Sequence, residues 1–94
     1  MILVIEYLKK AEKFLGKNQQ AFSKEKVDTL IIKAVKKIIK NEDINIDVKQ
    51  LQSNFKGFYR IRSGKVRILF EMVDNNIKII AIINDIDFRG NIYK

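Results

Sequence analysis

The 94-residue chain contains no cysteine and no histidine. Their absence excludes zinc fingers, Cys-x-x-Cys redox sites, structural disulfides and haem ligation by histidine. It also excludes Ser-His-Asp and Cys-His nucleophile systems. Any proton transfer must therefore use Asp, Glu, Lys or Tyr side chains, or a group that belongs to the substrate.

Long apolar runs are also missing. The longest unbroken ones span five residues each, at positions 1–5 and 79–83. Both are too short for the core of a signal peptide or for a membrane span. Proline is absent, the four glycines are scattered, and no repeat or low-complexity tract interrupts the chain. We therefore expect a single domain over residues 1–94 and a cytoplasmic location.

Negative charge is scarce relative to positive charge. The chain has 19 Lys and Arg residues against 11 Asp and Glu residues, a formal net charge of +8. A small basic domain indicates a polyanionic partner, most often nucleic acid. An acidic protein or an anionic membrane surface fits the same charge.

The first half of the sequence is rich in lysine and in helix-forming residues. Residues 2–6 are β-prone and predict a short opening strand, and residues 7–15 predict a short helix with Gly16 as its stop. A second helix should begin after the capping residue Ser23 and end near Asn41. Its apolar residues recur with the spacing of one helix face. They are Val27, Leu30, Ile31, Ala34, Val35, Ile38 and Ile39. Residues 41–48 read as a polar connection.

After Gly57 the apolar period changes to two, which predicts strands over residues 58–62 and 66–73 around a Ser63-Gly64 turn. A second turn at residues 74–76 precedes an apolar strand over 77–83. Residues 84–90 are expected to form a loop, and 91–94 a short final strand. The predicted fold class is α+β. It has a short N-terminal strand and two helices packed on one face of a three- to four-stranded antiparallel sheet.

Arginine and lysine gather around the first of these turns. If Ser63 and Gly64 form a two-residue turn, Arg62 lies opposite Lys65, Arg60 lies opposite Arg67, and all four cations share one sheet face. Like charges directly opposite one another destabilise a hairpin, so an anion is expected to bind there. Guanidinium groups suit phosphate. A three-residue turn would put Arg67 on the opposite face from Arg60 and break the cluster. The alternative without a binding role is that these arginines lie on the solvated edge of a half-exposed hairpin.

Two carboxylates, Asp85 and Asp87, stand two positions apart near the end of the chain. A pair alone is a weak signal for a divalent cation. We expect neither a metal ion nor a cofactor.

The segment from Leu51 through residues 57–70 (GFYRIRSGKVRILF), with the element order around it, resembles the RelE/ParE toxin superfamily. Its members often carry a Leu-x-Gly…Tyr-Arg-Ile-Arg-x-Gly-x-Tyr-Arg stretch, an apolar strand and a basic tail that ends in tyrosine. The tail here is residues 88–93 (FRGNIY). The resemblance extends over nearly the whole chain.

The resemblance implies the toxin of a type II toxin–antitoxin pair. For RelE-like members it implies a ribosome-dependent, metal-independent endoribonuclease, in which the 2′-hydroxyl of mRNA attacks the adjacent phosphate. Two alternatives stay open. One is a ParE-like inhibitor of DNA gyrase without nuclease activity. The other is a degenerate, non-catalytic member that only binds its antitoxin or nucleic acid.

Under this resemblance, Arg60 and Arg62 match basic strand residues of the family and are assigned to RNA binding and catalysis. Arg67 would contact the scissile phosphate. Arg89 matches the basic tail residue, and Tyr93 would orient a base or assist proton transfer. Lys65 joins the RNA-binding set on geometry alone.

Three positions depart from the family pattern. Phe88 stands where cleaving relatives often have histidine, Gly90 where another basic residue is frequent, and Lys65-Val66 where the family has Asp-Tyr. These departures put strong nuclease activity in doubt.

The expected partners are mRNA, the ribosome and an antitoxin with an acidic, helical segment. The antitoxin would cover the arginine face or displace the C-terminal tail. We expect no membrane partner, and oligomers only through the antitoxin.

Overall fold

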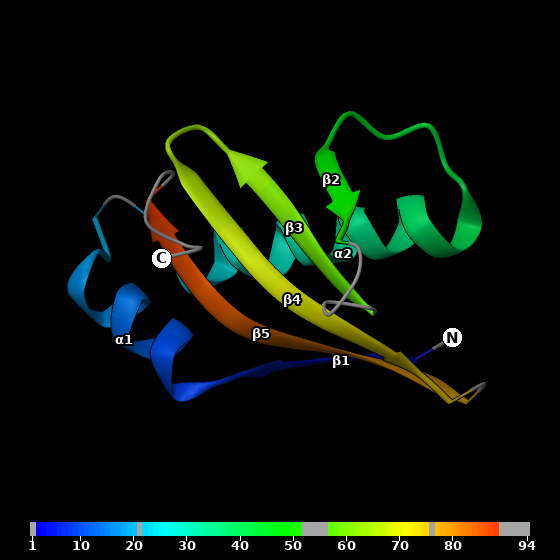
Figure 1. Ribbon diagram of the computed structural model, residues 1–94, viewed down its shortest axis with the longest axis horizontal. Helices are drawn as coiled ribbons and strands as arrows, with labels where there is room; N and C mark the ends of the chain where they lie inside the picture. The colour runs from blue at the N-terminus through cyan, green and yellow to red at the C-terminus, as the bar shows by residue number, and fades with distance from the viewer. Residues whose placement is uncertain (1, 21, 52–56, 76, 89–94) are drawn as a thin grey trace.

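A computed structural model describes residues 2–20, 22–51, 57–75 and 77–88. Along the chain it runs from a strand through two helices to four further strands (Figure 1). The elements are β1 (Ile2–Tyr7), α1 (Lys9–Lys17), α2 (Lys24–Lys40), β2 (Asp47–Gln50), β3 (Phe58–Ser63), β4 (Val66–Asp74) and β5 (Lys78–Phe88). The α+β class is therefore confirmed.

The sheet differs from the predicted one in size and direction. Within the described residues it has five strands in the order β1-β5-β4-β3-β2, not three to four. It is also mixed, because β1 runs parallel to β5 while the other neighbours are antiparallel. Strand β5 lies between β1 and β4 and pairs with both. Its apolar sequence indicates a central strand but does not indicate that β1 is its second neighbour.

Strand β2 was not predicted: its first two residues were wrongly placed in a polar connection over 41–48, and residues 49 and 50 were given no element. It is only four residues long, and three of them are exposed. Val48, opposite Ile61 of β3, is the residue of this strand that packs against the core. An edge strand this short and polar lacks the apolar alternation by which strands are recognised in a sequence.

Strand β5 continues to Phe88, where a loop was predicted over residues 84–90. The register shifts beside Leu69 and Phe70 of β4, which pair with Asp85 and Ile83. Asn84 is therefore the extra residue of a β-bulge, which interrupts the alternation of side chains. The core residues Ile83 and Ile86 are therefore three positions apart instead of two, and in the sequence that break in period resembles the end of a strand. The predicted final strand at 91–94 lies outside the described residues.

The predicted second helix is confirmed with both of its caps. The backbone N–H of Lys26 donates to Ser23 Oγ at 3.2 Å, and Asn41 ends the helix with a φ of 54°. The first helix begins later than predicted, because Tyr7 still pairs with β5. It also continues through Gly16, so that glycine is not its stop.

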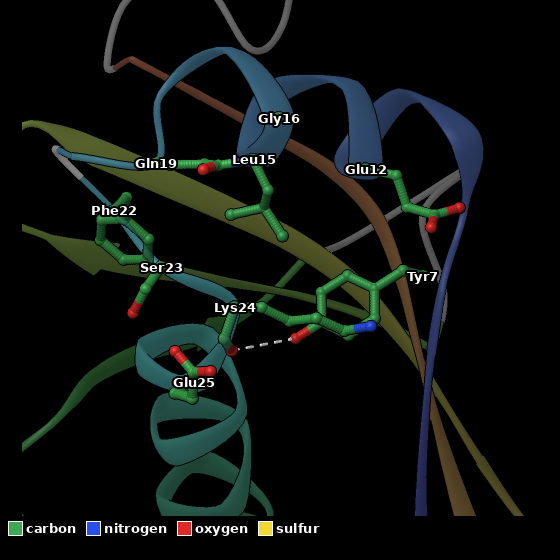
Figure 2. A pocket seen from close by; sticks show the side chains of 9 residues that line it. All are labelled: Tyr7, Glu12, Leu15, Gly16, Gln19, Phe22, Ser23, Lys24 and Glu25. Carbon is green, nitrogen blue, oxygen red and sulfur yellow. Dashed lines mark hydrogen bonds between the residues drawn. The ribbon is translucent and has the colours of Figure 1, made fainter.

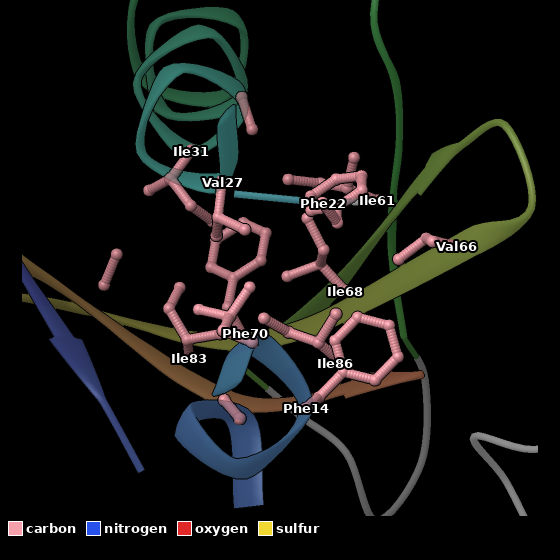
Figure 3. Close-up of a cluster of buried hydrophobic side chains, with 14 of the residues drawn as sticks. Phe14, Phe22, Val27, Ile31, Ile61, Val66, Ile68, Phe70, Ile83 and Ile86 are labelled. Carbon is pink, nitrogen blue, oxygen red and sulfur yellow. The ribbon is translucent and has the colours of Figure 1, made fainter. Parts of the chain in front are cut away.

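The hydrophobic core lies between one face of the sheet and the two helices (Figure 3). The strands contribute Ile61, Ile68, Phe70 and Ile83, among others, and α2 adds Val27 and Ile31. Both helices therefore serve the same core, as predicted. The opposite face of the sheet has no helix over it in the described part of the chain (Figure 1). Within the same residues, no helix is both long and apolar enough to cross a membrane.

Candidate functional site

The hairpin between β3 and β4 turns one residue later than predicted. Gly64 and Lys65 form the two-residue turn, so Ser63 pairs with Val66 and Arg62 lies directly opposite Arg67. Gly64 has a φ of 60°, which the first central position of a type II′ turn requires and which glycine adopts most readily. The predicted pairs of Arg62 with Lys65 and of Arg60 with Arg67 are therefore wrong.

Three of the predicted cations still share one face. Arg60, Arg62 and Arg67 alternate with the buried Ile61 and Ile68, so they occupy the sheet face opposite the core. Lys65 is exposed in the turn and outside the strand ladder. The one-residue shift kept the cluster because Arg67 now faces Arg62 instead of Arg60.

A row of four charges crosses the sheet at this level. Asp47 of β2 lies opposite Arg62, Arg62 opposite Arg67, and Arg67 opposite Asp87 of β5. We call these four residues the charged row. The two like charges in the middle repel each other, and a carboxylate on either side offsets this repulsion. The anion that the sequence led us to expect is thus supplied in part by the chain itself.

Arg60 lies beside the charged row and is almost fully buried, with 7% of its surface exposed. Its Nη1 donates to Asp47 Oδ1 at 2.9 Å. The other carboxylate oxygen, Oδ2, lies 3.8 Å from Nε of Arg62. One carboxylate therefore stands between two guanidinium groups. Sequence reasoning missed Asp47 because it missed β2.

The carboxylates of Asp85 and Asp87, noted as a pair in the sequence, have different partners. Asp85 is buried and forms an ion pair with Lys10 of α1, at 3.0 Å between Oδ2 and Nζ. Asp87 accepts the backbone N–H of Phe88 at 2.7 Å. Across the described ranges, no three side chains of the metal-binding kinds come together.

Of the predicted tail residues 88–93, the structure describes Phe88. Phe88 packs edge-on against Phe14 of α1, with ring centroids 5.4 Å apart. It therefore helps to join α1 to the end of β5. Arg89, Gly90 and Tyr93 lie outside the described residues, and the roles assigned to Arg89 and Tyr93 stay predictions.

A separate hollow of about 450 Å³ lies between α1 and the start of α2 (Figure 2). Tyr7 lines it and donates its phenolic hydrogen bond to Asp28, with the carbonyl of Lys24 at 3.4 Å. Burial, and then the Asp28 carboxylate, raise the pKa of Tyr7 above its usual value. Tyr7 belongs to the helix side of the sheet, so this hollow is not part of the arginine cluster.

The fold was compared with those of known proteins. No protein-family model matches the chain, and no curated protein matches it. Several solved structures match it over nearly its whole length. YafQ from Escherichia coli BL21(DE3) is 14% identical with a TM-score of 0.60, over 96% of this chain and 97% of that one. The chain has the fold of RelE/YafQ-type toxins.

Two further structures with this fold support the assignment. A metal-bound toxin from Helicobacter pylori is 14% identical with a TM-score of 0.63, over 98% of this chain and 100% of that one. RelE in the RelB–RelE antitoxin–toxin complex of Methanococcus jannaschii is 18% identical with a TM-score of 0.54, over 94% of both chains. The resemblance inferred from residues 57–70 is thus confirmed at the level of the fold.

Proposed function

We propose that this protein is the toxin of a type II toxin–antitoxin pair and that it cleaves mRNA. The observation that carries the proposal is the pair Arg62–Arg67, which stands on the uncovered face of a RelE/YafQ-type sheet. The net charge of +8 agrees with an RNA substrate. Proteins of this fold have been crystallised with antitoxins, as RelB–RelE and DinJ–YafQ.

The proposed chemistry needs no nucleophile from the protein. The 2′-oxygen of the RNA attacks the adjacent phosphorus, an O2′–P bond forms, and the P–O5′ bond breaks. The products are a 2′,3′-cyclic phosphate and a 5′-hydroxyl. The 2′ proton must go to a base, and the departing 5′-oxygen must receive a proton. The absence of cysteine and histidine is compatible with this reaction.

Arg62 and Arg67 suit the charge that develops on the phosphate. Residues directly opposite one another in a sheet have Cβ atoms about 4.5–5.5 Å apart. Two arginine side chains that begin this close together can place their guanidinium groups on different non-bridging oxygens of one phosphate. Such contacts stabilise the transition state more than the substrate, because the phosphorane carries more negative charge.

We assign proton transfer to Lys65 and Tyr93. Lys65 stands exposed in the turn that joins β3 to β4, where an RNA strand on the arginine face would pass. Tyr93 is the other candidate, and Arg89 adds positive charge for the phosphate. Cations near a tyrosine lower its pKa and help it to act as a base.

The partner proposed for the free toxin is an antitoxin with an acidic, helical segment that covers the arginine face. Opposite charge would speed association and select the partner. Co-expression with the small acidic protein encoded beside this one should give a stable complex. A pulldown that recovers no such protein would count against this partner.

The test is induction of this chain in a bacterial host, with growth recorded and the 5′ ends of mRNA mapped. New 5′ ends within codons are expected, and Arg67→Ala should remove most of them. Lys33→Ala on α2 is the matched control, since it removes one exposed positive charge away from the arginine face. Adding the purified chain to mRNA with and without ribosomes tests ribosome dependence.

Other outcomes select the alternatives. Growth arrest with intact mRNA and loss of DNA supercoiling would favour a gyrase inhibitor. Neither effect, together with binding of an acidic partner, would favour a non-catalytic member. In that case Phe88 and Gly90, where cleaving relatives often have histidine and a basic residue, are the first positions to restore.

A further inference from the structure

One carboxylate within the arginine cluster is placed as a phosphate would be. Asp47 directs Oδ1 to Arg60 Nη1, at 2.9 Å, and Oδ2 toward Arg62 Nε, at 3.8 Å. A phosphodiester likewise presents two charged oxygens to neighbouring guanidinium groups. The chain thus supplies an anion of its own to the same donors.

The two contacts of this carboxylate are unequal. The bond to Arg60 has the length of a full charge-assisted hydrogen bond, and Arg60 is buried. At 3.8 Å the contact with Arg62 is an ion pair without a hydrogen bond. The Arg62 side chain is 36% exposed and that of Asp47 is 54% exposed. Asp47 therefore holds Arg60 firmly and Arg62 loosely.

A phosphate bound to Arg62 and Arg67 would lie next to this carboxylate. The two negative charges would repel each other at close range and partly in water. Arg67 has a second carboxylate residue, Asp87, on its other side. Asp47 forms ion pairs with both Arg60 and Arg62 of β3, so part of the cost of bringing a phosphate to Arg62 falls on Asp47.

We propose that Asp47 is an internal competitor for the phosphate at Arg62 and Arg67, and that it keeps Arg60 as a structural residue. Substrate phosphate replaces the weak Asp47–Arg62 contact and leaves the Asp47–Arg60 bond in place. The site consequently binds an isolated phosphodiester weakly and needs additional contacts along the RNA. This inference rests on the proposed function only in taking the ligand to be an RNA phosphate.

The test compares Asp47→Asn with Glu71→Gln. Asparagine keeps the shape of Asp47 and still accepts a hydrogen bond from Arg60, but it carries no charge. Glu71→Gln removes the same charge from the same face of the sheet, in β4 opposite Phe58 and Ile82. It controls for net charge, because both variants raise it by one unit.

The probe is a fluorescein-labelled hexadeoxynucleotide, which lacks the 2′-hydroxyl and is not cleaved by this reaction. Its Kd is measured at two salt concentrations by fluorescence anisotropy. Asp47→Asn should bind about tenfold more tightly than the unchanged chain, and Glu71→Gln less than about twofold. Equal effects of the two variants, weaker binding by Asp47→Asn, or no binding by any of the three proteins would overturn the proposal.

A second measurement follows the arginine side chains directly. Inorganic phosphate is titrated into ¹⁵N-labelled protein, and the Nε–H resonances of the arginines are recorded. Arg62 and Arg67 should shift while Arg60 stays unchanged, and the shifts should saturate at lower phosphate in Asp47→Asn. If Asp47→Asn does not fold, Asp47→Glu replaces it and should bind phosphate as weakly as the unchanged chain. Tighter binding by Asp47→Glu, or a phosphate-dependent shift of Arg60, contradicts the proposal.

These results separate this inference from the proposed function. If the chain cuts no mRNA but Asp47→Asn binds phosphate more tightly, the competition by Asp47 stands and the proposed nuclease activity is wrong. If the chain cuts mRNA and Asp47→Asn binds the probe as Glu71→Gln does, the nuclease activity stands and the competition by Asp47 is wrong.

Discussion

The two faces of the central sheet are built from alternate residues of the same strands, yet they are stabilised in different ways. On β3 and β4, Ile61, Ile68 and Phe70 point into the core and are fully buried. Arg62 and Arg67 point the other way and are only partly covered. The core face gains from removing apolar surface from water. The outer face places like charges opposite each other and gains little stability from doing so.

This difference separates residues that maintain the fold from residues that are available for binding. A substitution on the core face should lower the free energy of unfolding by an amount that follows from the buried volume. A substitution of Arg62 or Arg67 should leave that free energy nearly unchanged and alter binding instead. Arg60 differs from these two arginines, because it is buried and hydrogen-bonded to Asp47.

The largest loss of stability is expected for Phe70→Ala. Phe70 is fully buried and its ring stacks on that of Tyr59, with centroids 5.6 Å apart. Truncation leaves a cavity and should cost about 3–5 kcal/mol of unfolding free energy, measured by urea denaturation. Tyr59→Phe keeps the stacked ring and serves as the control. A loss below about 1 kcal/mol for Phe70→Ala would show that this face is not the core, since buried phenylalanines cost more.

A smaller loss is expected for Arg60→Gln. The change removes a buried charge-assisted hydrogen bond to Asp47 and the packing of the arginine stem. Because Asp47 is half exposed and regains water, the cost should be about 1–2 kcal/mol, below that of breaking a fully buried pair. The same denaturation experiment measures it, with Lys49→Gln, opposite Arg60 on β2, as the charge control. Equal stabilities of the two variants would place Arg60 with the solvated arginines.

The helix side of the sheet should respond to alkaline pH through Tyr7. Its pKa is raised in the folded chain by burial and by Asp28, so the folded state holds the proton more tightly than the unfolded state. The stability due to this shift is fully present below the unfolded pKa of about 10 and is lost as the pH rises above it. Tyr7→Phe should be less stable at pH 7 by about 1 kcal/mol and should lose less stability than the unchanged chain between neutral and strongly alkaline pH. Parallel pH profiles for the two proteins would contradict this.

The smallest change in stability is expected for Arg62→Gln. It removes one of two opposed positive charges, and surface pairs are worth little, so the unfolding free energy should move by less than about 0.5 kcal/mol. Binding of the deoxynucleotide probe should nevertheless weaken several-fold. A clear loss of stability with unchanged binding would assign Arg62 to the fold and remove it from the site.

Much of the fold could be predicted because its signals are local. The α2 face, its Ser23 and Asn41 caps and the alternation on β3 and β4 each depend on residues close together in the chain. The hairpin register was missed by one residue, although Gly64 itself was a usable signal, since a type II′ turn takes glycine at its first central position. Strand periodicity and the assumed turn placed four cations on one face. The structure keeps Arg60, Arg62 and Arg67 there and puts Lys65 in the turn.

The amino-acid sequence by itself determined the α+β class, the two helices, the core face and the absence of cysteine and histidine chemistry. Only the tertiary structure decided that β1 joins β5 in parallel, that β5 continues past its bulge, and that β2 brings Asp47 to Arg60 and Arg62. The physical reason is that periodicity and capping act over a few residues. Strand partners and ion pairs across a sheet instead depend on residues far apart in the chain. A short polar edge strand such as β2 also lacks the apolar pattern by which a strand is recognised in a sequence.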